Sequence, residues 1–397
     1  MATAHLLQTP IRSDCLICSS ALFSEGREVE TMSTCRFLLS NGVISQASDA
    51  PTVTSFLETH PGAYTTTRTH NDGSCILFWG RHLNRLISSA KILLNSDPRL
   101  LFGSSWPADA WSASSMALSV WELGIPDLVN DSTRKVLPCA MRNREMGQEL
   151  AITVLLGGNL ESSRKSVHVD RKRVDGVLDV HVHVSAYVPP VFGARQSGAR
   201  LALVGRGRSV AAAKYSDWVR LRKPLERLRP PSVTELLLSD DGDHILEGTI
   251  TNFFVVCCKD NGEDNRKGMH PGTNVYSSFE VQTAPVTDGV LPGVLRQLVI
   301  EVCLWKGIPF REVAPSWSMH ELWEEAFITN GLRLLQHVDA ILVPSEHASL
   351  ESRTYKEVSW KEKQFQDGPG MVTRMIQKEI MEKAMLEGTY WIHHDRS

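Results

Sequence analysis

The chain has 397 residues, a length that predicts two domains, each large enough to bury a core. Its 42 lysines and arginines are outnumbered by 45 aspartates and glutamates, so a formal charge of −3 argues against nucleic acid as a partner. The apolar runs are short, as in Phe253 to Cys258, whereas a membrane-spanning helix needs about 20 apolar residues. We therefore expect a soluble protein with no nucleic-acid or membrane partner.

Residues 1–31 show no amphipathic or alternating pattern, and we predict a disordered N-terminal extension there. Its acidic residues are untypical of a transit peptide. We expect a cytoplasmic protein, with an organelle such as a plastid as the alternative if residues 1–31 are a transit peptide. Cys15 and Cys18 have zinc-knuckle spacing, but no second such pair follows, so we expect no metal site there. His181 and His183 alternate on one predicted strand without a further ligand at suitable spacing, and we interpret them as ordinary strand residues.

A small N-terminal α/β domain is predicted over residues 32–190. The β-prone run Tyr64 to Arg68, an Asn-Asp-Gly turn and the run Cys75 to Trp79 form the pattern of a hairpin. Apolar residues at three- and four-residue steps then predict a helix from Leu83 to Leu94. Weaker helical spacing follows at residues 116–123, and strands are expected at residues 35–39, 148–156 and 177–188.

Pro189-Pro190 and the Gly- and Arg-rich stretch after them predict an interdomain loop over residues 191–208. We place a large C-terminal domain at residues 209–350 and a charged helical C-terminal extension at residues 351–397. In the large domain we expect a hairpin formed by strands 235–238 and 252–258, an exposed insertion at 259–278, and a helix that begins at Pro292-Gly293 and ends near Gly307.

Six short motifs occur in a fixed order along the chain. They are Tyr64-Thr-Thr-Thr-Arg68, His82-Leu-Asn-Arg85, Lys214, Glu247-Gly-Thr-Ile-Thr-Asn252, Leu291-Pro-Gly-Val-Leu-Arg296 and Phe327-Ile-Thr-Asn330. Together they resemble the fold-type IV pyridoxal-phosphate enzymes, the class IV aminotransferase family of branched-chain aminotransferase, D-amino-acid transaminase and aminodeoxychorismate lyase. The resemblance spans roughly residues 34–345. It implies an α/β (α+β) fold of two domains, the larger one a pseudo-barrel, with pyridoxal 5'-phosphate between them.

The resemblance assigns the central chemistry to Lys214 and Glu247. An amine must hold the cofactor as a Schiff base and then move a proton, and Lys214 stands at the family's position for it. Glu247 would meet the pyridine nitrogen and keep it protonated, which makes the ring a stronger electron sink. The alternatives are an exposed surface lysine and a turn-flanking acid.

The cofactor phosphate needs fixed charges and backbone donors, which the start of a helix supplies. Gly293, Val294 and Leu295 fit that description, and Arg296 either adds charge or faces solvent. Arg85 would supply a guanidinium from the other domain. Thr329 and Asn330 are further candidate cofactor ligands, although a buried strand threonine is the alternative for Thr329.

Tyr64, Thr66 and Arg68 alternate along one strand and therefore point to the same side. In the family this strand borders the substrate pocket, where an arginine could bind a carboxylate. The alternative is a half-exposed sheet face.

The first functional hypothesis is a ping-pong aminotransferase that takes an amino acid and a 2-oxo acid as small-molecule partners. The second is an aminodeoxychorismate-lyase-like reaction, which the run Phe327 to Leu335 favours, although His337 replaces the family's usual proline. The third is a catalytically silent scaffold with the same fold. By resemblance we also expect a homodimer. The substrate and its D or L configuration stay open.

Overall fold

The computed structural model describes residues 35–45, 49–104, 118–159, 177–194, 197–258, 275–345 and 353–390. Tertiary contacts divide the chain into Met1–Ser33 and Thr34–Ser397, and the described residues all belong to the second unit. The expected disordered segment 1–31, the Cys15/Cys18 pair and residues 259–274 of the expected insertion lie outside the described part of the chain.

The first sheet has seven strands in the order β16-β4-β3-β5-β6-β1-β2, all joined antiparallel. The longest pairing in the sheet joins β5 and β6 over ten residues. β3 pairs with β4 through the expected Asn71-Asp72-Gly73 turn, in which all three residues have positive φ. The hairpin prediction is confirmed, although its second strand is only two residues long. The strands are β1 (Arg36–Ser40), β2 (Val43–Ser45), β3 (Ala63–His70), β4 (Cys75–Ile76), β5 (Glu149–Gly158), β6 (Leu178–Tyr187) and β16 (Thr389–Tyr390).

Helices α1 (Val53–Thr59), α2 (Trp79–Ser96), α3 (Arg99–Phe102) and α4 (Leu118–Asn143) pack with this sheet. The predicted periodicity of α2 is confirmed, since Leu83, Leu86, Ala90 and Leu93 are buried on one face. Of the weak helical spacing expected at residues 116–123, residues 118–123 belong to α4, which is 26 residues long and contains two prolines, and residues 116–117 lie outside the described part of the chain.

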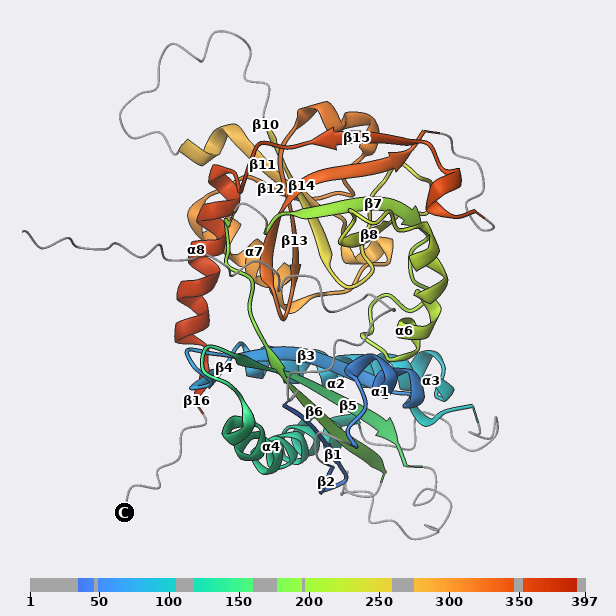
Figure 1. Cartoon of the computed structure of the whole chain (residues 1–397), viewed down its shortest axis with the longest axis vertical. Helices are drawn as coiled ribbons and strands as arrows, with labels where there is room; N and C mark the ends of the chain where they lie inside the picture. Colours follow the sequence, from blue (N-terminus) through green and yellow to red (C-terminus); the bar gives the residue numbers. More distant parts are fainter. Residues whose placement is uncertain are drawn as a thin grey trace, which may run out of the picture. The chain divides into compact units, whose positions relative to one another are not determined.

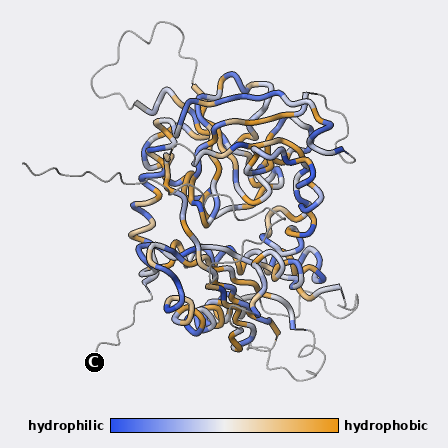
Figure 2. Tube along the Cα trace, in the orientation of Figure 1, coloured by the Kyte–Doolittle hydropathy of each residue, from blue (hydrophilic) through white to orange (hydrophobic). Residues whose placement is uncertain are grey.

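The second sheet closes into a barrel. Its strand order is β12-β11-β10-β13-β14-β7-β8-β9, and an additional pairing of β10 with β9 closes a ring of six strands, β10, β13, β14, β7, β8 and β9 (Figure 1). Figure 2 shows hydrophobic residues concentrated along these strands, and Leu201, Phe253, Val255, Ile328 and Ile341 form part of a buried cluster. The strands are β7 (Ala199–Gly205), β8 (Glu235–Leu238), β9 (Glu247–Gly248), β10 (Asn252–Cys258), β11 (Phe279–Thr283), β12 (Phe310–Glu312), β13 (Trp323–Asn330) and β14 (Leu334–Pro344), with β15 (Trp360–Gln364) paired to β14. The mixed α/β architecture with a barrel confirms the expected fold class.

Strand β7 corrects the expected loop over residues 191–208. Residues Ala199–Gly205 pair in parallel with both β14 and β8, so they lie inside the sheet. Leu201 and Leu203 are buried there. The glycines and arginines on both sides obscured this short apolar run. The division of the chain into domains stays a prediction.

The expected hairpin of β8 with residues 252–258 was also wrong in its pairing. β8 pairs with the two-residue strand β9, whereas β10 pairs with β11 and β13 along its length and with β9 at one position. A two-residue strand is too short to leave an alternating pattern in the sequence, which is why β9 was missed.

Helices α7 (Val294–Lys306) and α8 (Met371–Leu386) lie against the outer face of the barrel (Figure 1). Val294, Leu298 and Val302 of α7 share a buried cluster with Ile376 and Ile380 of α8. The C-terminal residues are therefore more than a charged helical extension. β15 extends the barrel sheet and β16 joins the first sheet, so described parts of residues 351–397 belong to both sheets.

Short helices complete the described part of the chain. They are α6 (Asp217–Leu221) and the 3-10 helices η2 (Lys223–Leu228), η4 (Val275–Ser278), η5 (Val286–Asp288), η6 (Trp317–Leu322) and η7 (Tyr355–Glu357). α6 and η2 confirm the helix expected near Trp218. Among the described helices, none combines the length and hydropathy that crossing a bilayer requires.

Candidate active site

Lys214 lies where the two sheets meet. Its backbone N–H donates to Ser89 Oγ of α2 at 3.0 Å, and its carbonyl accepts from the N–H of Tyr64 in β3 at 2.9 Å. The next residue, Tyr215, forms an isolated antiparallel bridge with Ala63. Backbone bonds therefore fix the lysine against the first sheet, while β7 anchors the preceding chain in the barrel.

The amine of Lys214 lies 4.6 Å from the center of the Tyr64 ring. Burial lowers the pKa of Lys214, and the nearby cations Arg85 and Arg208 lower it further, while Tyr64 opposes them. A lowered pKa leaves more of the amine unprotonated near neutral pH. The unprotonated form is the nucleophile, so this environment suits covalent chemistry at Nζ.

The phenol of Tyr64 is buried with this amine. Burial by itself would raise the pKa of Tyr64, but the positive charges of Lys214, Arg222 and Arg208 together lower it below its ordinary value. Tyr64 is therefore a better proton donor than an exposed tyrosine, and it faces the one amine that the sequence singled out.

Glu247 is 2% exposed and forms a buried ion pair with Arg208, with 2.8 Å between Oε1 and the guanidinium. Its other oxygen, Oε2, accepts from the N–H of Leu291 at 3.0 Å and from Asn252 Nδ2 at 3.4 Å. The guanidinium also donates to the carbonyl of Ala211 at 2.9 Å. Arg208 therefore ties the carboxylate to the segment that leads into Lys214.

Burial raises the pKa of Glu247, while Arg208, the N–H of Leu291 and the charge of Lys214 pull it down less strongly. The carboxylate is thus shielded from solvent, and a cation and a backbone N–H offset part of the cost of burying its charge. A carboxylate can accept about four hydrogen bonds, so Glu247 retains capacity for one more donor.

The N-terminus of α7 points backbone donors into this region. Gly293 is its N-cap, with extended φ and ψ, and no described side chain caps the helix. A Cβ on Gly293 would lie 2.0 Å from Asn252 Oδ1, so only glycine fits between the helix start and β10. The first N–H groups of a helix have no partner within it, which leaves those of Val294 and Leu295 oriented for an anion.

Arg296 does neither of the two things expected of it. Its side chain is 3% exposed, donates to the carbonyl of Ala284 at 2.9 Å and forms an ion pair with Glu312. It therefore neither faces solvent nor adds charge at the helix start. It anchors the first turn of α7 to β12 and the segment after β11.

Arg85 lies on α2, one turn after His82. Its Nη2 donates to Thr65 Oγ1 at 2.7 Å, and among the described residues its buried Nε has no hydrogen-bond partner. Burial lowers the pKa of Arg85 to about 10, with Tyr64 raising it and Arg208 lowering it. A part-buried cation whose buried Nε is an unused donor is expected to meet an anion.

Two buried hydroxyls lie next to Asn252. Thr329 of β13 is paired with Asn252 of β10, and Thr251 is the residue directly before Asn252. Within the described part of the chain, neither hydroxyl has a hydrogen-bond partner. Asn330 differs, because its Oδ1 accepts from the N–H of Leu332 at 3.0 Å and so closes the turn between β13 and β14.

The three expected substrate residues lie on one strand as predicted, but they have different surroundings. Tyr64 faces Lys214, whereas the hydroxyl of Thr66 lies 3.0 Å from that of Thr153 on β5. Arg68 is buried and donates from Nε to the carbonyl of Leu332 at 2.8 Å. Arg68 therefore links β3 to the turn that follows Thr329, and any role in binding a carboxylate stays a prediction.

Sequence reasoning missed three buried groups of this site, Arg208, Glu235 and His82. Arg208 was placed in a loop, although an arginine six residues before the lysine was a visible signal. Glu235 is 3% exposed and accepts from Thr249 Oγ1 at 2.8 Å and from the N–H of Ile250 at 3.1 Å, which fixes the turn before Thr251. A single acid in an apolar strand gives no such signal.

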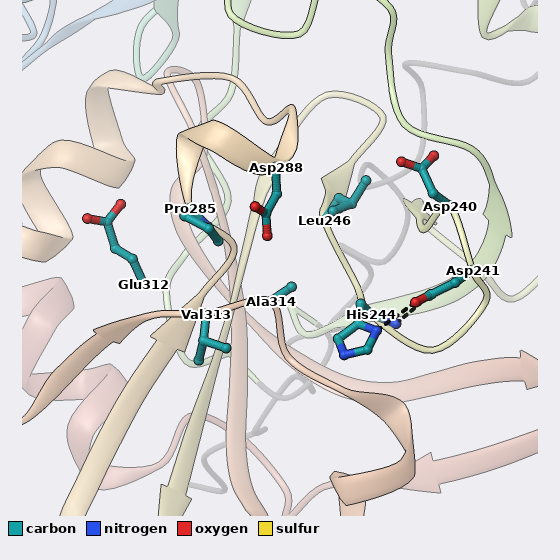
Figure 3. Close-up of a pocket in the computed structure, with 9 residues that line it drawn as sticks. All are labelled: Asp240, Asp241, His244, Leu246, Pro285, Asp288, Glu312, Val313 and Ala314. Carbon is teal, nitrogen blue, oxygen red and sulfur yellow. Dashed lines mark hydrogen bonds and ion pairs between the residues drawn. The ribbon is translucent and has the colours of Figure 1, made fainter.

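A separate cavity of about 310 Å³ lies beside the turn between β8 and β9 (Figure 3). Leu246 lines it, but no predicted site residue among those described does. Figure 3 shows its carboxylates, of which Asp241 is bonded to His244 at 2.6 Å and Glu312 is paired with Arg296. These acids already have partners, so the cavity adds nothing to the site around Lys214.

The two strand histidines, His181 and His183, lie on β6 and contact neighbouring groups. His181 lies 3.0 Å from Ser40 Oγ and His183 lies 3.0 Å from the carbonyl of Pro51, and burial lowers the pKa of each to about 4. Among the described residues, no group of three or more His, Cys, Asp or Glu side chains is placed to hold a metal.

Comparison with known proteins shows which family this chain resembles. Residues 175–341 match the family model described as amino-transferase class IV. The match covers less than half of the chain, and together with the fold it makes the chain similar to the class IV aminotransferase family. No curated protein matches the chain.

Solved structures of this family share the fold at low sequence identity. A branched-chain aminotransferase from Thermoproteus uzoniensis, solved with norvaline, is 17% identical with a TM-score of 0.55, covering 89% of this chain and 98% of the other. The Escherichia coli branched-chain aminotransferase is 18% identical with a TM-score of 0.52, covering 91% and 97%. A hypothetical aminotransferase from Mycobacterium tuberculosis, in a PLP-bound form, is 14% identical with a TM-score of 0.52, covering 89% and 99%. At these identities the likeness establishes a shared fold.

Proposed function

We propose that this chain is a pyridoxal-phosphate-dependent aminotransferase that moves an amino group between an amino acid and a 2-oxo acid by ping-pong kinetics. The observation that carries the proposal is the amine of Lys214, which has a lowered pKa and lies beside Tyr64 in a site that also contains a buried Glu247–Arg208 pair. When bound, pyridoxal phosphate supplies an electron sink that makes the bond at the amino acid's Cα labile.

The chain's own residues fit the phosphate of this cofactor. Arg85 brings a guanidinium whose buried Nε is unused, and α7 brings N–H groups at Val294 and Leu295 that no described side chain caps. Thr251 and Thr329 add two buried hydroxyls that have no partner among the described residues. Buried polar atoms without partners are costly, so the two hydroxyls and the start of α7 beside Asn252 favour an anionic ligand there.

Lys214 acts through Nζ in this proposal. Its neutral amine would hold the cofactor, and when free it would take a proton from the substrate's Cα and return it. Tyr64 is held against the same nitrogen and, with its lowered pKa, holds or returns a proton there. The backbone bonds to Ser89 and Tyr64 hold the main chain of Lys214 during both steps.

Glu247 acts at the opposite end, where its remaining acceptor capacity suits a protonated ring nitrogen. Its carboxylate is fixed by Arg208 and by the N–H of Leu291, so it does not rotate away when a ligand enters. Arg208 also favours the charged form of the carboxylate in a setting where burial raises its pKa.

The test is turnover with and without a 2-oxo acid co-substrate. The purified protein, loaded with pyridoxal phosphate, is given a panel of D- and L-amino acids with 2-oxoglutarate or pyruvate, and Lys214→Ala serves as the control. We expect amino-group transfer with parallel-line initial-rate plots, abolished in the control. Pyruvate released from a chorismate-derived amine without an oxo acid would identify a lyase. No turnover with a bound cofactor would favour the scaffold hypothesis.

A further inference from the structure

His82 is a fully buried side chain to which the proposed reaction gives no role. It lies on α2 one turn before Arg85, with 0% of its surface exposed. Its Nδ1 is 2.9 Å from Thr65 Oγ1 and 3.3 Å from Arg85 Nη2. Its other ring nitrogen, Nε2, is buried and has no hydrogen-bond partner among the described residues.

The partners of Nδ1 determine which ring nitrogen carries the proton. A guanidinium can only donate, so Arg85 gives its hydrogen to Thr65 Oγ1 at 2.7 Å. The hydroxyl hydrogen of Thr65 is then free to point at His82, and both neighbours of Nδ1 present hydrogens to it. Nδ1 must therefore be the acceptor, and in a neutral imidazole the proton lies on Nε2.

The surroundings also keep the imidazole neutral. Burial lowers the pKa of His82 well below its ordinary value, and the cations Arg85 and Lys214 lower it further. A neutral ring with Nδ1 as acceptor leaves a single donor, Nε2–H. The structure thus contains a buried donor of fixed direction that lacks an acceptor in the described part of the chain.

The ring of His82 also lies beside the turn that follows β13. A Cβ on Gly331 would lie 3.1 Å from Cε1 of His82, the carbon between the two ring nitrogens, and 2.3 Å from the carbonyl oxygen of Thr66. Glycine at this position therefore allows the turn after Thr329 to approach the ring. His82 is therefore one helical turn from Arg85 on α2 and next to the turn that follows Thr329 of β13, and both Arg85 and Thr329 are candidate phosphate ligands.

We propose that Nε2–H of His82 donates a hydrogen bond to a phosphate oxygen of bound pyridoxal phosphate. The inference rests on the proposed function, because it needs that cofactor. In this arrangement Thr65 fixes the imidazole tautomer and holds Arg85, so one hydroxyl orients both a neutral donor and a charged donor toward the same anion. His82 is a ligand-binding residue here and takes no part in proton transfer at Cα.

Two substitutions separate this role from a purely structural one. His82→Asn places Oδ1 where Nδ1 was and retains the bond to Thr65, but it lacks the distal donor. His82→Gln loses the bond to Thr65 but brings an amide N–H group to the place of Nε2–H. Each variant is prepared as apo-protein, and its affinity is measured by tryptophan fluorescence for pyridoxal phosphate and for pyridoxal, which lacks the phosphate.

We expect His82→Asn to bind pyridoxal phosphate about tenfold or more weakly than wild type, as for loss of a hydrogen bond to a charged group, with pyridoxal binding unchanged. His82→Gln should bind pyridoxal phosphate more tightly than His82→Asn does. Equal weakening for both ligands, or no weakening in His82→Asn, would overturn the inference. Should His82→Asn fail to fold, selective loss of pyridoxal phosphate affinity in His82→Gln would also overturn it. A wild-type protein that binds neither ligand would instead refute the proposed function.

Discussion

Lys214 is expected to cost the apo-protein stability, because the fold holds its amine in a place that disfavours the charged form. Burial and the cations Arg85 and Arg208 lower its pKa in the folded state, while an unfolded chain restores the ordinary value of 10.5. Replacing Lys214 by methionine retains the length of the apolar stem and removes the charge. We predict that Lys214→Met raises the free energy of unfolding at pH 7.

The sign of the pH dependence follows from proton binding. Between the lowered pKa and 10.5 the unfolded chain binds more protons at residue 214 than the folded chain does, so wild-type stability rises with pH in that window. The cost is fully present below the folded-state pKa and disappears as the pH approaches 10.5. The advantage of Lys214→Met should therefore be largest below the lowered folded-state pKa and shrink as the pH approaches 10.5.

The size of the effect is set by the linkage between pKa and free energy, in which each unit of pKa difference corresponds to about 1.4 kcal/mol. Replacements that relieve strain at functional sites commonly stabilise by about 0.5 to 2 kcal/mol. We expect a gain of about 1 kcal/mol at pH 7, since Tyr64 offsets part of the cost by attracting the charged amine.

Urea unfolding of the apo-protein at several pH values measures this directly. Lys378→Met is the matched control, because Lys378 is 73% exposed on α8 and its loss should leave stability nearly unchanged at every pH. Wild type and Lys214→Met are also compared in a Tyr64→Phe background, which removes the titration of the phenol. Parallel curves for wild type and Lys214→Met across pH would refute the reasoning.

Three further predictions concern stability and are checked by urea unfolding of the apo-protein. Arg208→Met should cost about 3 to 5 kcal/mol, because it leaves the carboxylate of Glu247 buried without its cation, and the double variant with Glu247→Gln should cost less than the single one. A double variant as unstable as the sum of the two singles would contradict the coupling. Gly331→Ala should cost about 1 to 3 kcal/mol, since its Cβ would lie 2.3 Å from the carbonyl oxygen of Thr66, and a neutral result would show that the turn is free to move. Glu325→Gln should cost about 1 kcal/mol, because Glu325 accepts from the N–H groups of Val372 and Thr373 in the first turn of α8 at 3.0 and 2.8 Å, and an unchanged midpoint would contradict that role.

The elements with long periodic patterns could be predicted from the sequence. The apolar spacing of α2 and the proline and glycine that begin α7 are local signals, and both helices are where the sequence places them. The six motifs are local signals too, because each is a short run of neighbouring residues. Their order along the chain implied the fold class. Lys214, Glu247 and the start of α7 are close enough in the fold to share one site, as the resemblance implies.

The rest depends on contacts between distant parts of the chain. β7 is buried because β14 and β8 pair with it on both sides, and neither partner is visible from its seven residues. Arg208 matters because Glu247 lies opposite it, and His82 because Thr65 fixes its tautomer. No local pattern records such pairs, which is why sequence reasoning placed Arg208 in a loop and gave His82 no role of its own.

The most direct test of the central claim is borohydride reduction of the purified protein supplied with pyridoxal phosphate, followed by mapping of the modified peptide. The account predicts a visible absorption band that disappears on reduction and a stable pyridoxyl adduct on Lys214. An adduct on another lysine, or no band, would contradict the assignment of Lys214 as the residue that holds the cofactor.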